Sequence, residues 1–171
     1  MSAQVKDESN SERQAKAQLE SIKEMVERLR HCRECEDWDN RESCELTDAE
    51  VYSGIGLWHE GQTATDDERI QYHNEEEARQ MIEEDALSVE VRSDWHTPGG
   101  DPQDSKPTEY MILLCTGGPA CRIVGQLDQW SQPETAKIEH QDWFTPWTEL
   151  RVDSEDEAAM VEYAGCFYFG D

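Results

Sequence analysis

The fold is decided by residues 110–127, YMILLCTGGPACRIVGQL. The first six residues are apolar on both faces of an extended chain, which is typical of a strand inside a sheet. The next four, TGGP at 116–119, combine two glycines with a proline and favour a turn. From Cys121 to Leu127 apolar and polar side chains then point to opposite faces, as in a strand with one buried face. The stretch therefore predicts two neighbouring antiparallel strands.

Two further segments repeat the period of two. Leu87, Val89 and Val91 alternate with polar residues and predict a half-buried strand. Residues 135–141 alternate again, with Ala136 and Ile138 on the apolar face. Strands connected in this way predict an α+β fold, with an antiparallel sheet of about four strands and helices on one side.

A helix is predicted upstream of the sheet, over residues 13–35. Its apolar residues recur at steps of four and three, which makes a narrow stripe of the kind that faces another helix. The stripe predicts a homodimer interface, with the alternative that the helix folds back over the sheet of its own chain. It consists of Ala15, Leu19, Ile22, Val26 and Leu29.

Helix starts are indicated by polar residues three positions ahead of a glutamate. Thr47 with Glu50 marks one start, and Asn74 opens a helix that runs to about residue 85. Ser154 with Glu157 opens a third. The expected organisation is an N-terminal helix and irregular linker over 1–46, followed by an acidic α+β domain over 47–171.

The charge is strongly one-sided. Forty aspartates and glutamates face 15 lysines and arginines, for a formal charge of −25. Such a chain repels phosphate groups and anionic membranes, which argues against direct nucleic-acid or membrane binding. No apolar run approaches the roughly 20 residues of a membrane span. The first residues, MSAQVKDESNSER, lack the apolar core of a signal peptide. A soluble protein of the cytoplasm is therefore expected.

The acids are densest in three triplets, and the expected partner-binding surface is built on them. Because self-repulsion costs stability, the excess charge suggests a use, with solubility or a halophilic source as the simpler explanation. Trp143 and Trp147 flank an aromatic cluster that is either a second partner anchor or part of the core. The triplets are Asp66-Asp67-Glu68, Glu75-Glu76-Glu77 and Glu83-Glu84-Asp85.

Two arrangements could carry other chemistry. His31, Cys32 and Cys35, with Cys44 and His59, have part of the spacing of a zinc site, but no second C-x-x-C follows. The favoured interpretation is that the cysteines pack as small hydrophobic residues. A nucleophile at Cys115 with His96 and Asp94 is weaker still, because Cys115 precedes a turn after an apolar strand. No metal, cofactor or catalytic residue is predicted.

Four runs of sequence resemble a family of small uncharacterised proteins of bacteriophages and prophages. They lie within residues 62–171 and read LSVEVRSDWHTPGG (87–100), ILLCTGGPACRIVGQLD (112–128), HQDWFTPWTEL (140–150) and FYFG (167–170). The resemblance implies a phage setting and brings no catalytic residues. In size and charge, though not in sequence, the chain is also similar to anti-CRISPR and antirestriction proteins.

These observations predict a non-catalytic inhibitor that acts in the cytoplasm of an infected bacterium. Its carboxylates would stand where the phosphates of DNA lie and would block a basic nucleic-acid-binding subunit of a host defence complex. A CRISPR surveillance complex is the first expected target and a restriction enzyme the second. A phage structural or assembly protein is the main alternative, and a small zinc module or a hydrolase is less favoured.

Overall fold

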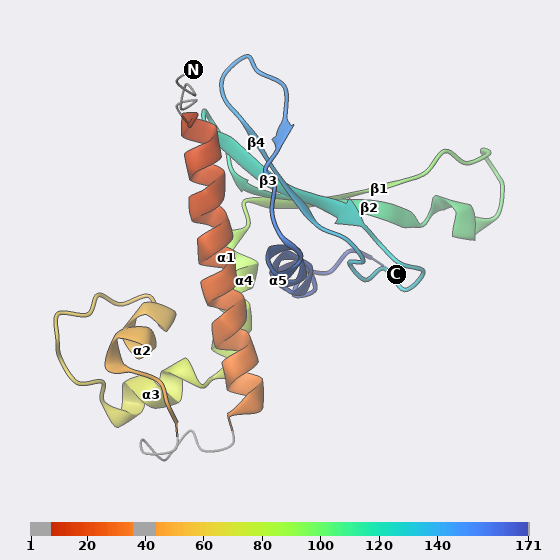
Figure 1. Ribbon diagram of the computed structural model, residues 1–171. Helices are drawn as coiled ribbons and strands as arrows, with labels where there is room; N and C mark the ends of the chain where they lie inside the picture. The colour runs from red at the N-terminus through yellow and green to blue at the C-terminus, as the bar shows by residue number, and fades with distance from the viewer. Residues whose placement is uncertain (1–7, 36–43, 171) are drawn as a thin grey trace.

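The computed structural model describes residues 8–35 and 44–170 (Figure 1). The chain is α+β, as predicted, and its elements follow one another in an order that places four helices before the sheet and one after it. They are α1 (Asn10–Glu34), α2 (Asp48–Gly54), α3 (Asp66–Tyr72), α4 (Glu75–Asp85), β1 (Ser88–Ser93), the short 3-10 helix η1 (Pro102–Ser105), β2 (Pro107–Cys115), β3 (Ala120–Gln126), β4 (Lys137–Gln141), β5 (Thr148–Glu149) and α5 (Ser154–Ala164).

The sheet is antiparallel throughout, with its five strands in the order β1-β2-β3-β4-β5. The two strands predicted from residues 110–127 are β2 and β3, and Ile112 pairs with Ile123 across them. The strand predicted at 135–141 is β4. The fifth strand is additional. It has only two residues and pairs with β4 at Glu139 and His140, so it is too short to show a period in the sequence.

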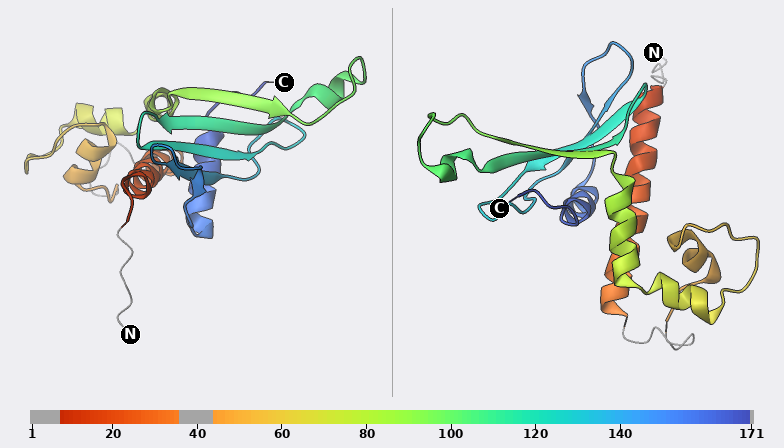
Figure 2. Two further views of the ribbon diagram at one scale, coloured as in Figure 1. Left: turned by 90° about the horizontal axis from the view of Figure 1, so that it is seen from above. Right: turned by 180° about the vertical axis from the view of Figure 1, so that it is seen from behind.

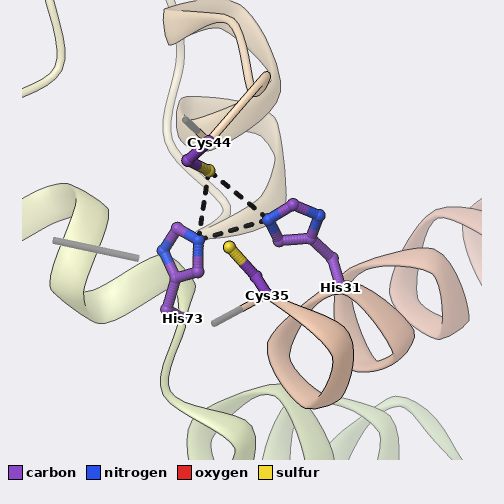
Figure 3. Close-up of side chains that lie close together, drawn as sticks. All are labelled: His31, Cys35, Cys44 and His73. Atoms are coloured by element: carbon purple, nitrogen blue, oxygen red, sulfur yellow. Dashed lines mark hydrogen bonds between the residues drawn. The ribbon is translucent and has the colours of Figure 1, made fainter. Parts of the chain in front are cut away.

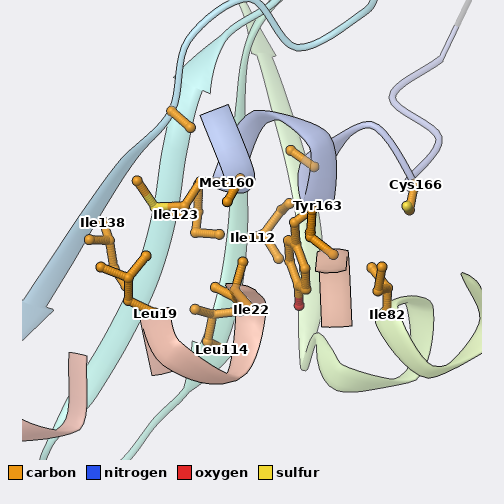
Figure 4. Packing of buried hydrophobic residues seen from close by; sticks show 14 of the residues in the cluster. Leu19, Ile22, Ile82, Ile112, Leu114, Ile123, Ile138, Met160, Tyr163 and Cys166 are labelled. Carbon is orange, nitrogen blue, oxygen red and sulfur yellow. The ribbon is translucent and has the colours of Figure 1, made fainter. Parts of the chain in front are cut away.

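Helices α1 and α5 cover the same face of the sheet (Figures 1 and 2). The inward side chains of the strands, including Ile112, Ile123 and Ile138, meet Leu19 and Ile22 of α1 and Met160 of α5 (Figure 4). One continuous core results. The long N-terminal helix is therefore a central element of the fold. Among the described helices, none is both long and apolar enough to cross a membrane.

The predicted dimer stripe is used inside the chain. Its five residues are 0–5% exposed and belong to the core that α1 shares with the sheet, α4 and α5. The dimer interface predicted through this stripe is wrong, and the fold-back alternative is observed. Because the stripe already contacts its own sheet, it is not available to a second chain. The stripe consists of Ala15, Leu19, Ile22, Val26 and Leu29.

Strand β1 has the predicted alternation but not the predicted burial. Val89 and Val91 lie on the same face as Ile112 and Tyr110, yet both remain exposed. These valines remain exposed because β1 is an edge strand, whereas α1 packs on β3 and β4, toward the opposite edge of the sheet. Periodicity identifies which side chains share a face, but it does not show whether another layer covers that face.

Helices α2 and α3 form a small module beside the far end of α1 (Figure 1). Its own core has five buried residues and is separate from the main core. Helix α2 begins at the predicted capping box of Thr47 and Glu50. Helix α3 was not predicted, although Thr65 and Glu68 form the same box ahead of it. The buried residues of the module are Val51, Tyr52, Ile55, Ala64 and Tyr72.

The other end of α1 is held by a buried polar contact with β4. Ser11 Oγ donates to Asp142 Oδ2 at 2.9 Å and lies 2.8 Å from His140 Nδ1. Because a hydroxyl has one hydrogen and Ser11 gives it to the carboxylate, His140 must donate from Nδ1 to Ser11. Both Ser11 and His140 are buried. The contact therefore fixes the helix and the tautomer of His140 together.

Ser11→Ala is expected to lower the free energy of unfolding by about 1–2 kcal/mol, because it leaves the Nδ1 hydrogen of His140 without an acceptor in a buried site. Urea denaturation measures this loss. Ser21→Ala, an exposed serine of the same helix, is the matched control and should change stability by less than about 0.5 kcal/mol. Equal stabilities of the two variants would contradict the assigned contact.

Candidate functional site

A groove of about 1050 Å³ separates the α2–α3 module from α1 and α4. Met25 and Met81 lie in it, and its rim is acidic. None of its carboxylates forms an ion pair with a lysine or arginine among the residues that the structure describes. The groove thus concentrates negative charge between two walls, where field lines are focused. The acids are Glu24 and Glu27 of α1, Glu50 of α2, and Glu77, Glu84 and Asp85 of α4.

The predicted acidic triplets are only partly in this groove. Glu77, Glu84 and Asp85 line it, whereas the other six triplet residues do not. Several of those six serve local structure. Glu75 pairs with Arg33 at 2.8 Å, and Glu83 pairs with Arg79 at 3.3 Å. The remaining members outside the groove are Asp66, Asp67, Glu68 and Glu76.

Helix caps keep two acids of this region ionised. Hydrogen bonds from the side chain and backbone of Thr47 lower the pKa of Glu50. The backbone and side chain of Thr65, together with the hydroxyl of Tyr52, lower the pKa of Glu68 in the same way. A bond to the charged form of a carboxyl group favours that form. Both groups are therefore carboxylates at neutral pH, one at the groove and one at the start of α3.

The groove acids on α1 and α2 were missed by sequence reasoning. Glu24 and Glu27 are three residues apart and project from the polar side of α1, and Glu50 comes from the first turn of α2. Each is separated from the triplets by 16 or more residues of sequence. Their helical spacing marked a polar face, but no local signal shows that this face meets α4 across a groove.

The predicted aromatic anchor is at the surface but far from the acids. Trp143 is 66% exposed, and Phe144 beside it is fully exposed. Trp147 is half-buried under the guanidinium of Arg122, which lies 4.1 Å from the centre of its ring. These residues follow β4, near the start of α1, whereas the groove lies toward the end of the helix (Figure 1). The structure does not unite the tryptophans and the triplets in one surface.

Arg28 connects the module to α1 from within the groove. It is 2% exposed, and its guanidinium donates to Tyr72 O at 3.1 Å, Gly54 O at 2.9 Å and Gln71 O at 2.8 Å. These carbonyls end α2 and α3, where a helix has acceptors without internal donors. Burial lowers the pKa of Arg28, which nevertheless stays charged at neutral pH. One side chain of α1 thus caps both helices of the module.

Four side chains with nitrogen and sulfur atoms converge where α1, the segment before α2 and the end of α3 meet (Figure 3). One potential ligand atom from each side chain, a ring nitrogen or a thiol sulfur, lies within 4.8 Å of the other three. Cys44 is buried, and burial lowers the pKa of His31, which favours its neutral form. Imidazoles and thiolates are metal ligands. The four residues are His31, Cys35, Cys44 and His73.

This cluster differs from the partial zinc pattern in the sequence. Cys32 is outside it, because its thiol donates to Tyr72 O at 3.1 Å and burial raises its pKa. His59 is outside it too, with its ring tilted against that of Tyr52 at 5.6 Å between ring centres. His73 takes the fourth position, and it is 29 residues from Cys44 in the chain. No spacing rule connects residues that far apart.

The cysteine nucleophile considered from sequence gains no support from its contacts. The thiol of Cys115 points to Pro119 O at 4.0 Å, and burial raises its pKa, whereas an activated thiol has a lowered pKa. The ring of His96 is engaged through Nδ1 with Asp94 O at 3.1 Å. The thiol and the imidazole each therefore interact with a backbone carbonyl of their own surroundings.

Comparisons of the chain with protein-family models, curated proteins and solved structures find no match. The resemblance to phage proteins over residues 62–171 therefore stays a prediction.

Proposed function

We propose that this protein is a non-catalytic inhibitor, encoded by a phage, that binds the basic nucleic-acid-binding surface of a host defence protein. The observation that carries the proposal is the acidic groove between α1, α4 and the α2–α3 module, in a chain of net charge −25. A CRISPR surveillance complex is the first target to test, and a restriction enzyme is the second.

Charge complementarity supports this function. Nucleic-acid grooves are lined by lysine and arginine, and a rigid acidic surface competes for the same positive field. The carboxylates of this surface lie on both walls of a groove. With acids on both walls, the groove suits a basic helix or loop that enters between α1 and the module. Occupying such a segment removes it from contact with phosphate.

The rigidity of both walls supports binding further. Glu24 and Glu27 stand on the longest helix, whose opposite side is in the main core, and Glu84 stands on α4 next to it. The opposite wall is held by Arg28. Charged side chains on rigid elements lose less conformational entropy on binding than charged side chains on flexible segments. The groove is therefore organised before a partner arrives.

The test measures how strongly this protein inhibits the binding of DNA to a purified CRISPR surveillance complex. Reversing three groove acids, with Glu24→Lys, Glu27→Lys and Glu84→Lys, should raise the half-inhibitory concentration about 100-fold or more, since close charge pairs couple by about 1.5–7 kcal/mol. Inhibition by the unmodified protein should also weaken between roughly 50 and 500 mM salt, as the Debye length falls from about 14 to 4 Å.

A second triple variant controls for net charge. Glu90→Lys, Asp94→Lys and Glu134→Lys change exposed acids outside the groove and raise the formal charge from −25 to −19, as the groove variant does. Circular dichroism verifies that both variants fold. The control should change inhibition by less than about fivefold. Equal losses in both variants would assign binding to net charge alone. If neither the surveillance complex nor a restriction enzyme is bound, the proposal fails and an assembly role is favoured.

A further inference from the structure

The geometry points to a structural zinc site formed by His31, Cys35, Cys44 and His73 (Figure 3). We infer that one Zn²⁺ ion binds these four side chains and joins the α2–α3 module to α1. The inference is independent of the proposed inhibitory function, because it concerns how the chain is held together.

The distances within the cluster match a tetrahedral ion. Zinc bonds of about 2.3 Å to sulfur and 2.0–2.1 Å to nitrogen place neighbouring ligand atoms about 3.3–3.8 Å apart. Cys44 Sγ lies 3.5 Å from His31 Nε2 and 3.4 Å from His73 Nε2. The two Nε2 atoms are 3.2 Å apart. Cys35 Sγ, within 4.8 Å of all three, needs to approach by only about 1 Å.

The hydrogen bond behind His73 orients it as a ligand. His73 Nδ1 lies 2.7 Å from Arg69 O, and because a carbonyl only accepts, Nδ1 carries the hydrogen. In the neutral ring Nε2 then has a lone pair, and this lone pair faces His31 and Cys44. Metal-bound histidines commonly donate their other ring N–H to a backbone carbonyl in this way. Without an ion, the 3.2 Å contact between the two Nε2 atoms requires a proton on His31 Nε2, and a bound cation takes the place of that proton.

The position of the cluster explains what the ion would do. His31 and Cys35 come from the last turn and C-cap of α1, Cys44 precedes α2, and His73 caps α3. The module has only five buried core residues, which is little for an independent unit. Small units of this kind are commonly stabilised by a metal. Four protein ligands close the coordination shell, which is the arrangement of structural rather than catalytic zinc.

Metal content of the full chain, prepared without a histidine tag and supplied with Zn²⁺, tests the inference. One equivalent of zinc per chain should survive dialysis, and Cys44→Ser or His73→Gln should retain less than about 0.1 equivalent. Cys32→Ser is the matched control, because this neighbouring half-buried cysteine is outside the cluster, and it should keep one equivalent. Zinc below about 0.1 equivalent in the unmodified chain, or unchanged zinc in Cys44→Ser, would overturn the site.

A measurement on the unmodified chain tests the site without variants, so misfolding of a variant cannot account for the result. Zinc should slow alkylation of Cys35 and Cys44 at least about tenfold relative to the chelated protein, while Cys115 of β2, the internal reference, keeps its rate. Co²⁺ in place of zinc should give the visible absorption of a tetrahedral thiolate site. Equal alkylation with and without zinc, or an octahedral Co²⁺ spectrum, would refute the assignment.

Discussion

Ile22→Glu is expected to leave the chain without a stable fold at neutral pH. Ile22 is fully buried among side chains of the sheet, α4 and α5, so the new carboxylate would enter the main core without a partner. The lost packing costs about 2–5 kcal/mol, and burying an unpaired charge costs several more. Together these approach or exceed the whole stability of a typical domain, about 5–15 kcal/mol. Far-ultraviolet circular dichroism and urea titration measure the loss.

Ser21→Glu adds the same charge at the neighbouring, exposed position of α1 and should change stability by about 0.5 kcal/mol or less. Ile22→Ala is a milder core variant and should cost about 2–5 kcal/mol without preventing folding. If Ile22→Glu remained folded with unchanged stability, α1 would not be packed on its own sheet. The apolar stripe would then again be available as a dimer interface.

Arg28→Met is expected to release the α2–α3 module from α1. Methionine fills part of the volume but leaves the carbonyls of Gly54, Gln71 and Tyr72 without the donors that now reach them. An unsatisfied buried carbonyl costs about 1–3 kcal/mol, so the loss of donors to three of them is expected to cost about 3 kcal/mol or more. Hydrogen exchange should therefore speed up about 100-fold or more across residues 44–73, and remain slow in β2 and β3.

The same substitution at Arg30 is the control. Arg30 lies two residues away on α1, is exposed and pairs with Glu162 at 2.6 Å. Arg30→Met should cost less than about 1 kcal/mol and leave exchange in the module unchanged, because exposed ion pairs contribute little. Arg28→Lys should resemble Arg28→Met, since one ammonium cannot serve three separate carbonyls as a guanidinium does. Full protection of residues 44–73 in Arg28→Met would contradict the anchoring role.

Local patterns predicted the elements well. The alternation after Cys121 and the TGGP turn are confirmed as strand β3 and the β2–β3 connection, because side-chain direction in a strand depends only on neighbouring residues. Helix α1 begins three residues earlier than predicted, after the Ser9 cap. Helix α5 is capped by Asp153 rather than by Ser154. Such shifts are small because a cap is chosen among adjacent polar side chains.

The candidate sites were predicted less well, because each joins distant segments. The acid triplets were visible as runs, but whether a carboxylate lines the groove or pairs with arginine depends on which helix lies opposite. Likewise, three members of the His/Cys cluster were noticed, and His73 was not. Its sequence neighbourhood contains no second cysteine or histidine, and only the turn after α3 brings it to Cys44.

The sequence by itself determined the α+β class, the apolar stripe of α1 and the strongly negative charge, since these follow from composition and from the periods of strand and helix. Only the tertiary structure decided what the stripe contacts, which carboxylates line the groove, and that His31, Cys35, Cys44 and His73 meet. The physical reason is that packing of α1 on the sheet and capping by Arg28 set distances between residues far apart in the chain, and no local period encodes those distances.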